Sequence, residues 1–315
     1  MIVTVTLNPA LDKTARVDAL EVRALNRLRG VRVDAGGKGL NVSAAIRALG
    51  GESVAVGFAG GGAGGELLSM AAEAGIRTDF VRIAGTTRTN LKITDSGGGL
   101  TELNEPGPEI TPAEWREMEA KLCGYGKPGN IVAVSGSLPA GLGGDTYKKL
   151  CAALRGLGAV VFLDADGEAL RLALGSPPDE MPHCVKPNSF ELLRCFGLAE
   201  GENAGEARLA GLCRSLVRRG TKLVALSMGD AGAIFAGENG AWRYGALPVS
   251  VGSAVGAGDC MVAALALGLE LGLPDGERFA LAMAASAAAC STEGTCPPER
   301  ALVDGLLGLA RPVKL

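Results

Sequence analysis

Short runs rich in β-branched residues alternate with longer stretches of helical pattern along most of this chain. The β-branched runs predict strands, and the spacing of apolar residues between them predicts helices. We expect strands at residues 1–7, 53–58, 131–135, 159–163, 183–186 and 223–227, and helices at residues 40–49, 65–74, 112–122, 145–157, 189–196 and 205–219, with three more after Gly256. Strands joined through helices pair in parallel, so the alternation predicts a mostly parallel α/β sheet flanked by helices.

Two segments depart from this alternation. Residues 14–33 and 79–103 alternate polar and apolar side chains and carry turn signals, but they have no helical pattern. Within the second segment, residues 96–99 are a glycine-rich turn between two strand-like runs, which predicts a β-hairpin. We expect an α/β core of residues 1–13, 34–78 and 104–315 and a small β lid of residues 14–33 and 79–103, with a plain edge hairpin as the alternative.

The composition favours small-molecule partners. The chain has 315 residues, of which 47% are hydrophobic, and its 31 basic and 34 acidic residues give a net charge of −3 without long blocks of one sign. The sequence has no stripe of basic residues of the kind that binds nucleic acid. Its longest low-charge stretch, residues 279–290, is too short to cross a bilayer. The eight cysteines form no C-x-x-C pair, and the chain opens on a strand-like run, so we expect reduced thiols in a cytoplasmic protein.

A glycine-containing turn near the C-terminus suits phosphoryl transfer. Gly256, Ala257, Gly258 and Asp259 run directly into an apolar helical pattern. Glycines let an anion approach the backbone, and the start of a helix favours a phosphate. Asp259 then stands where a base would deprotonate an attacking hydroxyl. The alternative is a helix start with an ordinary acidic first turn.

A second glycine-rich turn spans residues 34–41. Gly36, Gly37, Lys38 and Asn41 precede or open a helical pattern, and they could grip a polyhydroxy compound, with Lys38 at a phosphate or a sugar oxygen. The turn is not a Walker A loop, because Arg32 occupies the position of its first glycine. A tight strand-to-helix turn without binding function is the alternative.

Two further segments could hold a nucleotide and its metal. Asn188 and Glu191 are three positions apart on one helical face and could bind hydrated Mg²⁺, which needs few protein oxygens. The alternative for this pair is a helix capping box. Residues 227–232 follow a strand and resemble a nucleotide-contacting loop, although a plain turn has the same pattern.

Other chemistries find little support. Residues 60–65 satisfy G-x-G-x-x-G, which keeps a dinucleotide-dependent oxidoreductase as an alternative, but Asp79 precedes the next strand where the ribose-binding acid should end it. His183 is the only histidine and is more typical of a structural residue than of a catalytic one. No G-x-S-x-G elbow and no zinc-ligand spacing occurs.

Six motifs follow one another along the chain. They are TVTLNPALD at residues 4–12, GGKGLN at 36–41, TRTNLKI at 87–93, SGSLP at 135–139, KPN at 186–188 and GAGD at 256–259. In this order they resemble the PfkB (ribokinase-like) sugar kinases over the whole chain. The resemblance is to the phosphosugar branch, which contains 1-phosphofructokinases, tagatose-6-phosphate kinases and minor 6-phosphofructokinases.

The resemblance implies a ribokinase-like, doubly wound core with a small β-strand lid that pairs with a second subunit in a homodimer. It implies ATP and Mg²⁺ as cofactors and Asp259 as the base, with Gly256 and Gly258 shaping the anion hole. The implied substrate-binding residues are Asp12, Gly36, Gly37, Lys38, Asn41, Arg88, Asn90, Lys92 and Ser137. The implied nucleotide-site residues are Asp164, Lys186, Asn188, Glu191, Ser227, Gly229, Gly232 and Ala257, with Asn188 and Glu191 at the metal.

Fructose 1-phosphate is the acceptor that the resemblance favours, because residues 87–93 and 104–108 look most like 1-phosphofructokinases. Tagatose 6-phosphate and fructose 6-phosphate are the alternatives, and a non-catalytic sugar-phosphate sensor is a further one. Cys260 and Asp166 depart from the family pattern, which leaves the nucleotide affinity open.

Overall fold

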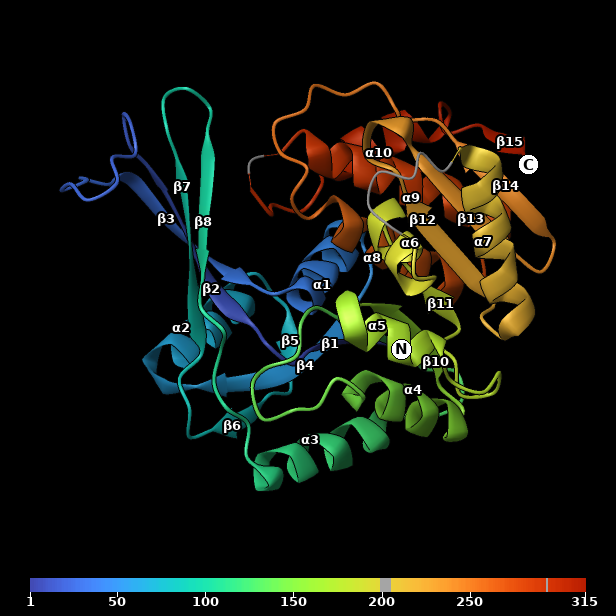
Figure 1. Cartoon of the computed structure of the whole chain (residues 1–315), viewed down its shortest axis with the longest axis horizontal. Coiled ribbons are helices and arrows are strands. Elements are labelled where there is room, and N and C mark those ends of the chain that lie inside the picture. The colour runs from blue at the N-terminus through green and yellow to red at the C-terminus, as the bar shows by residue number, and fades with distance from the viewer. Residues whose placement is uncertain (199–204, 293) are drawn as a thin grey trace.

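The computed structural model describes residues 1–198, 205–292 and 294–315, and one large sheet runs through it (Figure 1). Its strand order is β15-β14-β13-β12-β11-β10-β9-β1-β4-β5, with β6 also paired to β4. The strands are β1 (Ile2–Thr6), β4 (Ser53–Gly60), β5 (Arg77–Thr78), β6 (Val81–Ile83), β9 (Ile131–Ser135), β10 (Val160–Asp164), β11 (Cys184–Val185), β12 (Leu223–Ser227), β13 (Ala233–Gly237), β14 (Gly240–Tyr244) and β15 (Pro312–Lys314). All neighbours from β5 and β6 to β12 pair in parallel. The predicted mostly parallel α/β sheet is confirmed.

Helices cover both faces of this sheet. They are α1 (Lys38–Ala48), α2 (Gly61–Glu73), α3 (Pro112–Tyr125), α4 (Thr146–Gly156), α5 (Gly167–Leu174), α6 (Ser189–Cys195), α7 (Glu206–Arg219), α8 (Ala257–Glu270), α9 (Asp275–Cys290) and α10 (Arg300–Leu307). Alternate side chains of β1 enter different cores: Val3 and Val5 pack with α3 to α7, whereas Ile2 packs with α1, α8, α9 and α10. This period of two explains why every residue of β1 is buried and why the fold is doubly wound.

A separate sheet of four strands projects from the core (Figure 1). Its order is β3 (Arg29–Gly36), β2 (Ala10–Arg16), β7 (Arg88–Thr94) and β8 (Leu100–Asn104). The predicted hairpin is confirmed as the antiparallel pair β7 and β8. Its turn is held by Asp95, whose Oδ1 accepts the backbone N–H groups of Gly97 and Gly99 at 2.9 and 2.8 Å. We call these four strands the small sheet.

The strand pairing differs from the predicted lid boundaries after residues 13, 33 and 78. The small sheet begins at Ala10 and continues to Gly36, so it includes residues 10–13 and 34–36, which were expected in the core. In the other direction, β6 was expected in the lid but pairs with β4 of the large sheet. The reason is burial, because Val81 and Ile83 alternate with exposed Arg82 and pack into the main core.

Some elements were not predicted. The strands β13, β14 and β15 add an antiparallel edge to the large sheet, and α5 follows β10 directly. In addition, α2 begins at Gly61, four residues before the predicted helix start at residue 65, because tertiary contacts outweigh the low helix propensity of glycine. Within the described residues, no helix has the length and apolar character needed to cross a membrane.

Candidate active site

Charged side chains of the predicted site gather at the carboxyl ends of the parallel strands, where ligands bind in open α/β sheets. Asp164 is the last residue of β10, Lys186 follows β11, and Asp259 lies in the first turn of α8. Lys38 opens α1, which packs closely against α8. The fold therefore brings together residues from four distant segments of the chain.

Asp259 is held in a buried position. Its side chain is 5% exposed, and the amide Nδ2 of Asn41 donates a hydrogen bond to Oδ2 at 2.8 Å. Burial, and then the negative charge of Asp164, raise the pKa of the Asp259 carboxyl to about 7, while Asn41 and two lysines oppose the shift. Such a carboxylate is a stronger proton acceptor than an exposed aspartate, as a general base requires.

Two lysines and one aspartate lie beside Asp259. Lys38 Nζ is 3.2 Å from Asp164 Oδ1, and Lys186 Nζ is 3.4 Å from the same oxygen. Burial lowers the pKa of Lys38, but the charges of Asp164 and Asp259 outweigh it and raise this pKa overall, so Lys38 is a cation at neutral pH. A Cβ on Gly258 would lie 3.0 Å from Lys186 Nζ, so a larger residue there would displace the end of this lysine by a few tenths of an ångström.

The start of α8 is shaped for an anion. Gly256 precedes the helix with φ of +84°, in the left-handed region that favours glycine, and no side chain caps the helix. The helix is 14 residues long, and its first N–H groups carry the partial positive charge of the helix dipole. These groups lie on the side of Lys38 and Lys186.

The small sheet supplies a second polar cluster. In the register of β2 and β7, Asp12 stands beside Asn90, whose Nδ2 donates to Asp12 Oδ1 at 2.9 Å. Lys92 Nζ lies 3.1 Å from Asp12 Oδ2. A Cβ on Gly36 would lie 2.6 Å from Asp12 Cγ, so glycine at this position leaves room for the carboxylate.

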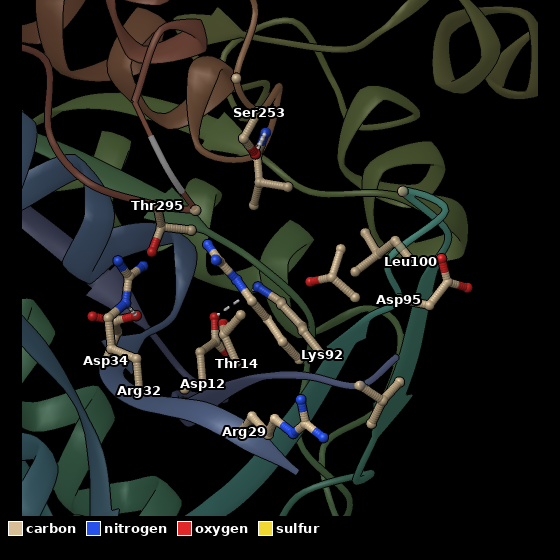
Figure 2. A pocket seen from close by; sticks show the side chains of 18 of the residues that line it. Asp12, Thr14, Arg29, Arg32, Asp34, Lys92, Asp95, Leu100, Ser253 and Thr295 are labelled. Atoms are coloured by element: carbon tan, nitrogen blue, oxygen red, sulfur yellow. Dashed lines mark hydrogen bonds and ion pairs between the residues drawn. The ribbon is translucent and has the colours of Figure 1, made fainter. Parts of the chain in front are cut away.

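A cavity of about 1040 Å³ opens between this cluster and the loops near α8. Figure 2 shows Lys92 reaching toward Asp12, with Arg29 and Arg32 on the same side and Ser253 and Thr295 opposite. Its lining is mixed in charge: it holds the basic residues Arg16, Arg29, Arg32 and Lys92 and the acidic residues Asp12, Asp18, Asp34 and Asp95.

Arg88 and Ser137 lie at the junction of the two sheets. The guanidinium of Arg88 donates to two backbone oxygens, Glu105 O at 2.9 Å and Asn8 O at 3.1 Å. Ser137 is exposed after β9, and its Oγ accepts a hydrogen bond from Asn8 Nδ2 at 3.3 Å. Asn8 was not singled out from the sequence. The signal that could have found it is an Asn-Pro pair directly after a buried strand, at the ligand-binding edge of the sheet.

The predicted nucleotide residues follow β11 and β12. Asn188 and Glu191 form a capping box on α6, in which Asn188 Oδ1 accepts Glu191 N–H at 2.8 Å and Glu191 Oε2 accepts Asn188 N–H at 2.9 Å. Ser227 lies beside Asn188 in an isolated β-bridge. Gly232 has φ of +95°, and a Cβ there would lie 2.1 Å from Tyr244 O, so this glycine is required by the fold. Gly229, with φ of +60°, opens the intervening turn.

The residues that suggested a dinucleotide site or a catalytic histidine have structural roles. The N-terminus of α2 is covered by the loop before β7, because Gly60 N–H donates to Thr87 Oγ1 at 3.1 Å and a Cβ on Gly61 would lie 2.9 Å from Thr86. His183 Nδ1 accepts Val161 N–H at 3.0 Å, and burial, with two nearby cations, lowers its pKa to about 4. Gly60 N–H and His183 Nδ1 are thus both used in hydrogen bonds within the fold.

Asp166 and Cys260, which depart from the family pattern, are not part of the group formed by Lys38, Lys186, Asp164 and Asp259. Asp166 is exposed at the N-cap of α5, and Cys260 is a buried core residue of α8.

Residues 5–302 match the model of the pfkB family carbohydrate kinases. This chain belongs to the pfkB family. As a pfkB-family kinase it is a phosphotransferase that acts on an alcohol group of a sugar phosphate, and the buried acid at the start of α8 is in accord with that chemistry.

Similar proteins span nearly the same length as this kinase. The 1-phosphofructokinase of Xanthomonas campestris pv. campestris is 40% identical over 85% of this chain and 83% of its own. That of Rhodobacter capsulatus is 39% identical over 99% of this chain and 96% of its own. The crystal structure of phosphofructokinase-2 from Escherichia coli in complex with substrates and products superimposes with a TM-score of 0.91 at 29% identity, covering 98% of this chain and 99% of that one.

Proposed function

We propose that this kinase transfers the γ-phosphoryl group of ATP to fructose 1-phosphate and forms fructose 1,6-bisphosphate. The observation that carries the chemistry is the buried Asp259, held by Asn41 at the start of α8 and faced by Lys38 and Lys186. The choice of acceptor is supported by two relatives, each a 1-phosphofructokinase, that are 40% and 39% identical to this chain.

In the proposed reaction the sugar hydroxyl forms a bond to the γ-phosphorus while the bond from that phosphorus to the bridging oxygen of ADP breaks. Asp259 accepts the hydroxyl proton, which its raised pKa favours. Negative charge spreads over the phosphoryl oxygens, and the N–H groups at Gly258 and the start of α8, together with Lys38, stabilise it.

The sugar phosphate is proposed to lie between the small sheet and α1. Its hydroxyls would contact Asp12, Gly36, Gly37 and Asn41. Its phosphate would lie near Arg88, Asn90, Lys92 and Ser137. The hydrogen bonds of Asn90 and Lys92 to Asp12 support this arrangement, because they hold these side chains in place before substrate binds.

ATP is proposed to lie across the ends of β10, β11 and β12. The proposed contacts are Asp164, Lys186, Asn188, Glu191, Ser227, Gly229, Gly232 and Ala257. The capping box already uses Asn188 Oδ1 and Glu191 Oε2, which leaves Glu191 one carboxylate oxygen. Asp164 Oδ2 is buried and has no hydrogen-bond partner within the described part of the chain, so it offers a second oxygen. These two oxygens suit Mg²⁺ held mainly by water and by ATP, where the ion would neutralise phosphate charge.

The small sheet is proposed to act as a lid over the sugar phosphate and as the contact between two subunits of a homodimer. The lid role is supported by the cavity that this sheet closes on one side. The dimer is supported by Leu103 of β8, which is 57% exposed. We also propose that the enzyme works in the cytoplasm, where its substrates are made and where its eight free cysteines stay reduced.

One assay tests this function. ADP release is measured with fructose 1-phosphate, fructose 6-phosphate and tagatose 6-phosphate at matched concentrations, and the highest kcat/KM is expected for fructose 1-phosphate. A higher value for either 6-phosphate would replace the proposed acceptor. Binding without ADP release would indicate a sensor, and an NAD(P)-dependent absorbance change would indicate an oxidoreductase.

A further inference from the structure

Asn8 lies where the chain passes between the large sheet and the small sheet. Residues 7–9 lead from β1 into β2, and residues 105–111 lead from β8 back to α3. The side chain of Asn8 is buried, at 5% exposure. Its Nδ2 donates to Pro106 O at 3.1 Å, to Ser137 Oγ at 3.3 Å and to Leu138 O at 3.5 Å. One amide therefore joins the return segment to the loop that presents Ser137.

The backbone of Asn8 is fixed as well. Arg88, the first residue of β7, donates to Asn8 O at 3.1 Å and to Glu105 O at 2.9 Å. Glu105 in turn accepts the N–H of Thr89 through Oε2 at 2.9 Å. Three connections between the sheets, at residues 7–9, 84–88 and 105–107, are thus held together by hydrogen bonds at Asn8 and Arg88.

Gly107 closes this junction from the other side. Its φ is +93°, and a Cβ there would lie 2.2 Å from Asn8 Oδ1. Oδ1 is buried and has no hydrogen-bond partner in the described ranges, so the 105–107 turn passes this close to the amide only because residue 107 has no Cβ. The 105–107 turn and the Asn8 side chain therefore determine each other's place.

We propose that Asn8 is a positioning residue for the sugar phosphate. Its hydrogen bonds couple the position of the small sheet to the position of Ser137. When the return segment moves, the amide moves with it and Ser137 loses its hydrogen-bond donor. The inference rests on the proposed function, because it takes Ser137 as a substrate contact. Asn8 itself acts through Ser137 and Arg88.

The first test is Asn8→Ala. After a melting curve confirms folding, the KM for the sugar phosphate should rise about tenfold while the KM for ATP stays within about twofold. Asn130→Ala is the matched control, because Asn130 Nδ2 also donates to a backbone oxygen, Tyr125 O at 2.9 Å, far from the site. Equal changes in both KM values, or no change in either, would overturn the proposal.

The second test is a double-mutant cycle with Gly107→Ala. This variant should raise the KM for the sugar phosphate, and the effect should shrink in the Asn8→Ala background, because the atom that the new Cβ meets is gone. Gly129→Ala is the control, since it imposes a similar φ of +84° with nothing within 4 Å. Independent effects of the two changes would contradict the coupling. If Asn8→Ala does not fold, the sugar-phosphate KM of Gly107→Ala against that of Gly129→Ala decides.

A third readout separates this inference from the proposed function. Amide hydrogen exchange is followed without substrate at Ile110, whose N–H donates to Ala140 O at 2.9 Å, and at Gly136, whose N–H donates to Asp164 O at 2.9 Å. It should speed up at both in Asn8→Ala but not in Asn130→Ala. If the wild type phosphorylates none of the three sugar phosphates, the proposed function is wrong and exchange alone judges the coupling. Exchange that stays slow at Ile110 and Gly136 in Asn8→Ala would show that Asn8 does not hold the loop.

Discussion

At the scale of single residues, the basicity of Asp259 depends more on the burial of its carboxylate than on the ordinary pKa of an aspartate. A free aspartate has a pKa near 4, whereas burial and the charge of Asp164 raise the pKa of Asp259 to about 7. The hydrogen bond from Asn41 opposes this shift and fixes the orientation of the carboxylate. The residue is therefore both basic and oriented.

Asp259→Asn should remove the base while leaving the shape of the site. We expect kcat to fall by about 10²–10⁴-fold, the usual contribution of a general base. The Kd for the sugar phosphate, measured by calorimetry, should change by less than about threefold. Asp166→Asn is the control, because Asp166 is an exposed acid nearby and outside the cluster. A near-normal kcat in Asp259→Asn would remove Asp259 from the mechanism.

The raised pKa of Asp259 also sets the pH dependence. A base must be unprotonated, so activity should be lost as the pH falls through that pKa, and the raised value puts this loss in the neutral range. A profile of kcat/KM against pH should decline about tenfold per pH unit on the acid side. A decline that begins only near pH 4 would mean that the carboxylate behaves as an exposed one.

At the scale of elements, α6 combines a structural cap with the proposed metal site. The capping box satisfies the two backbone N–H groups of Asn188 and Glu191, and such a cap contributes about 1 kcal/mol. It uses only one of the two carboxylate oxygens of Glu191. The two roles can therefore be separated by substitution.

Asn188→Ala should lower the free energy of unfolding by about 1 kcal/mol, because it removes the cap acceptor. Glu191→Gln keeps an oxygen for the cap but loses the charge. It should raise the Mg²⁺ concentration needed for half-maximal activity several-fold with little change in stability. Urea unfolding and Mg²⁺ titration of both variants check this. An unchanged Mg²⁺ requirement in Glu191→Gln would leave α6 with a structural role only.

At the scale of the whole molecule, the small sheet carries Asp12 and Lys92 to one side of the large cavity. Its hairpin turn is stabilised by Asp95 and by Ser96, whose Oγ donates to Asp18 O at 2.6 Å. A sheet held this way can exclude water from the phosphoryl group when it closes.

Replacing residues 96–99 by a two-residue Asn-Gly turn removes the hydrogen bond from Ser96 to Asp18 O, and should therefore loosen the hold of the hairpin on the rest of this sheet. Water then reaches the phosphoryl group more easily, so less bisphosphate should form for each ATP consumed. Parallel measurement of sugar product and ADP gives the ratio, and an unchanged ratio would contradict the lid role.

The proposed dimer is tested on the exposed side of the same sheet. Leu103→Asp places a charge in an apolar contact and should shift the sedimenting species from dimer to monomer. Leu309→Asp is the control, because Leu309 is similarly exposed, at 52%, but lies after α10. Equal sedimentation of both variants and the wild type would remove the small sheet from the interface.

Much of the fold was predictable because its signals are local. The strands β1, β4, β9, β10 and β12 were expected from β-branched runs, and they form the buried centre of the sheet. The strands β13 to β15 and the boundary at β6 were missed, since short edge strands gain their stability from pairing and burial that no local pattern records. The start of α2 among glycines was missed for the same reason.

The sequence by itself determined the α/β class, the helix cap at Asn188 and Glu191, and the kinds of residue available for phosphoryl transfer. These depend on local spacing and side-chain chemistry. Only the tertiary structure decided that Asn41 reaches Asp259 across 218 positions, that Lys38 reaches Asp164 across 126, and that Asn8 joins two sheets. Such contacts follow from strand order and helix packing, and so do the burial and the nearby charge of Asp164 that raise the pKa of Asp259.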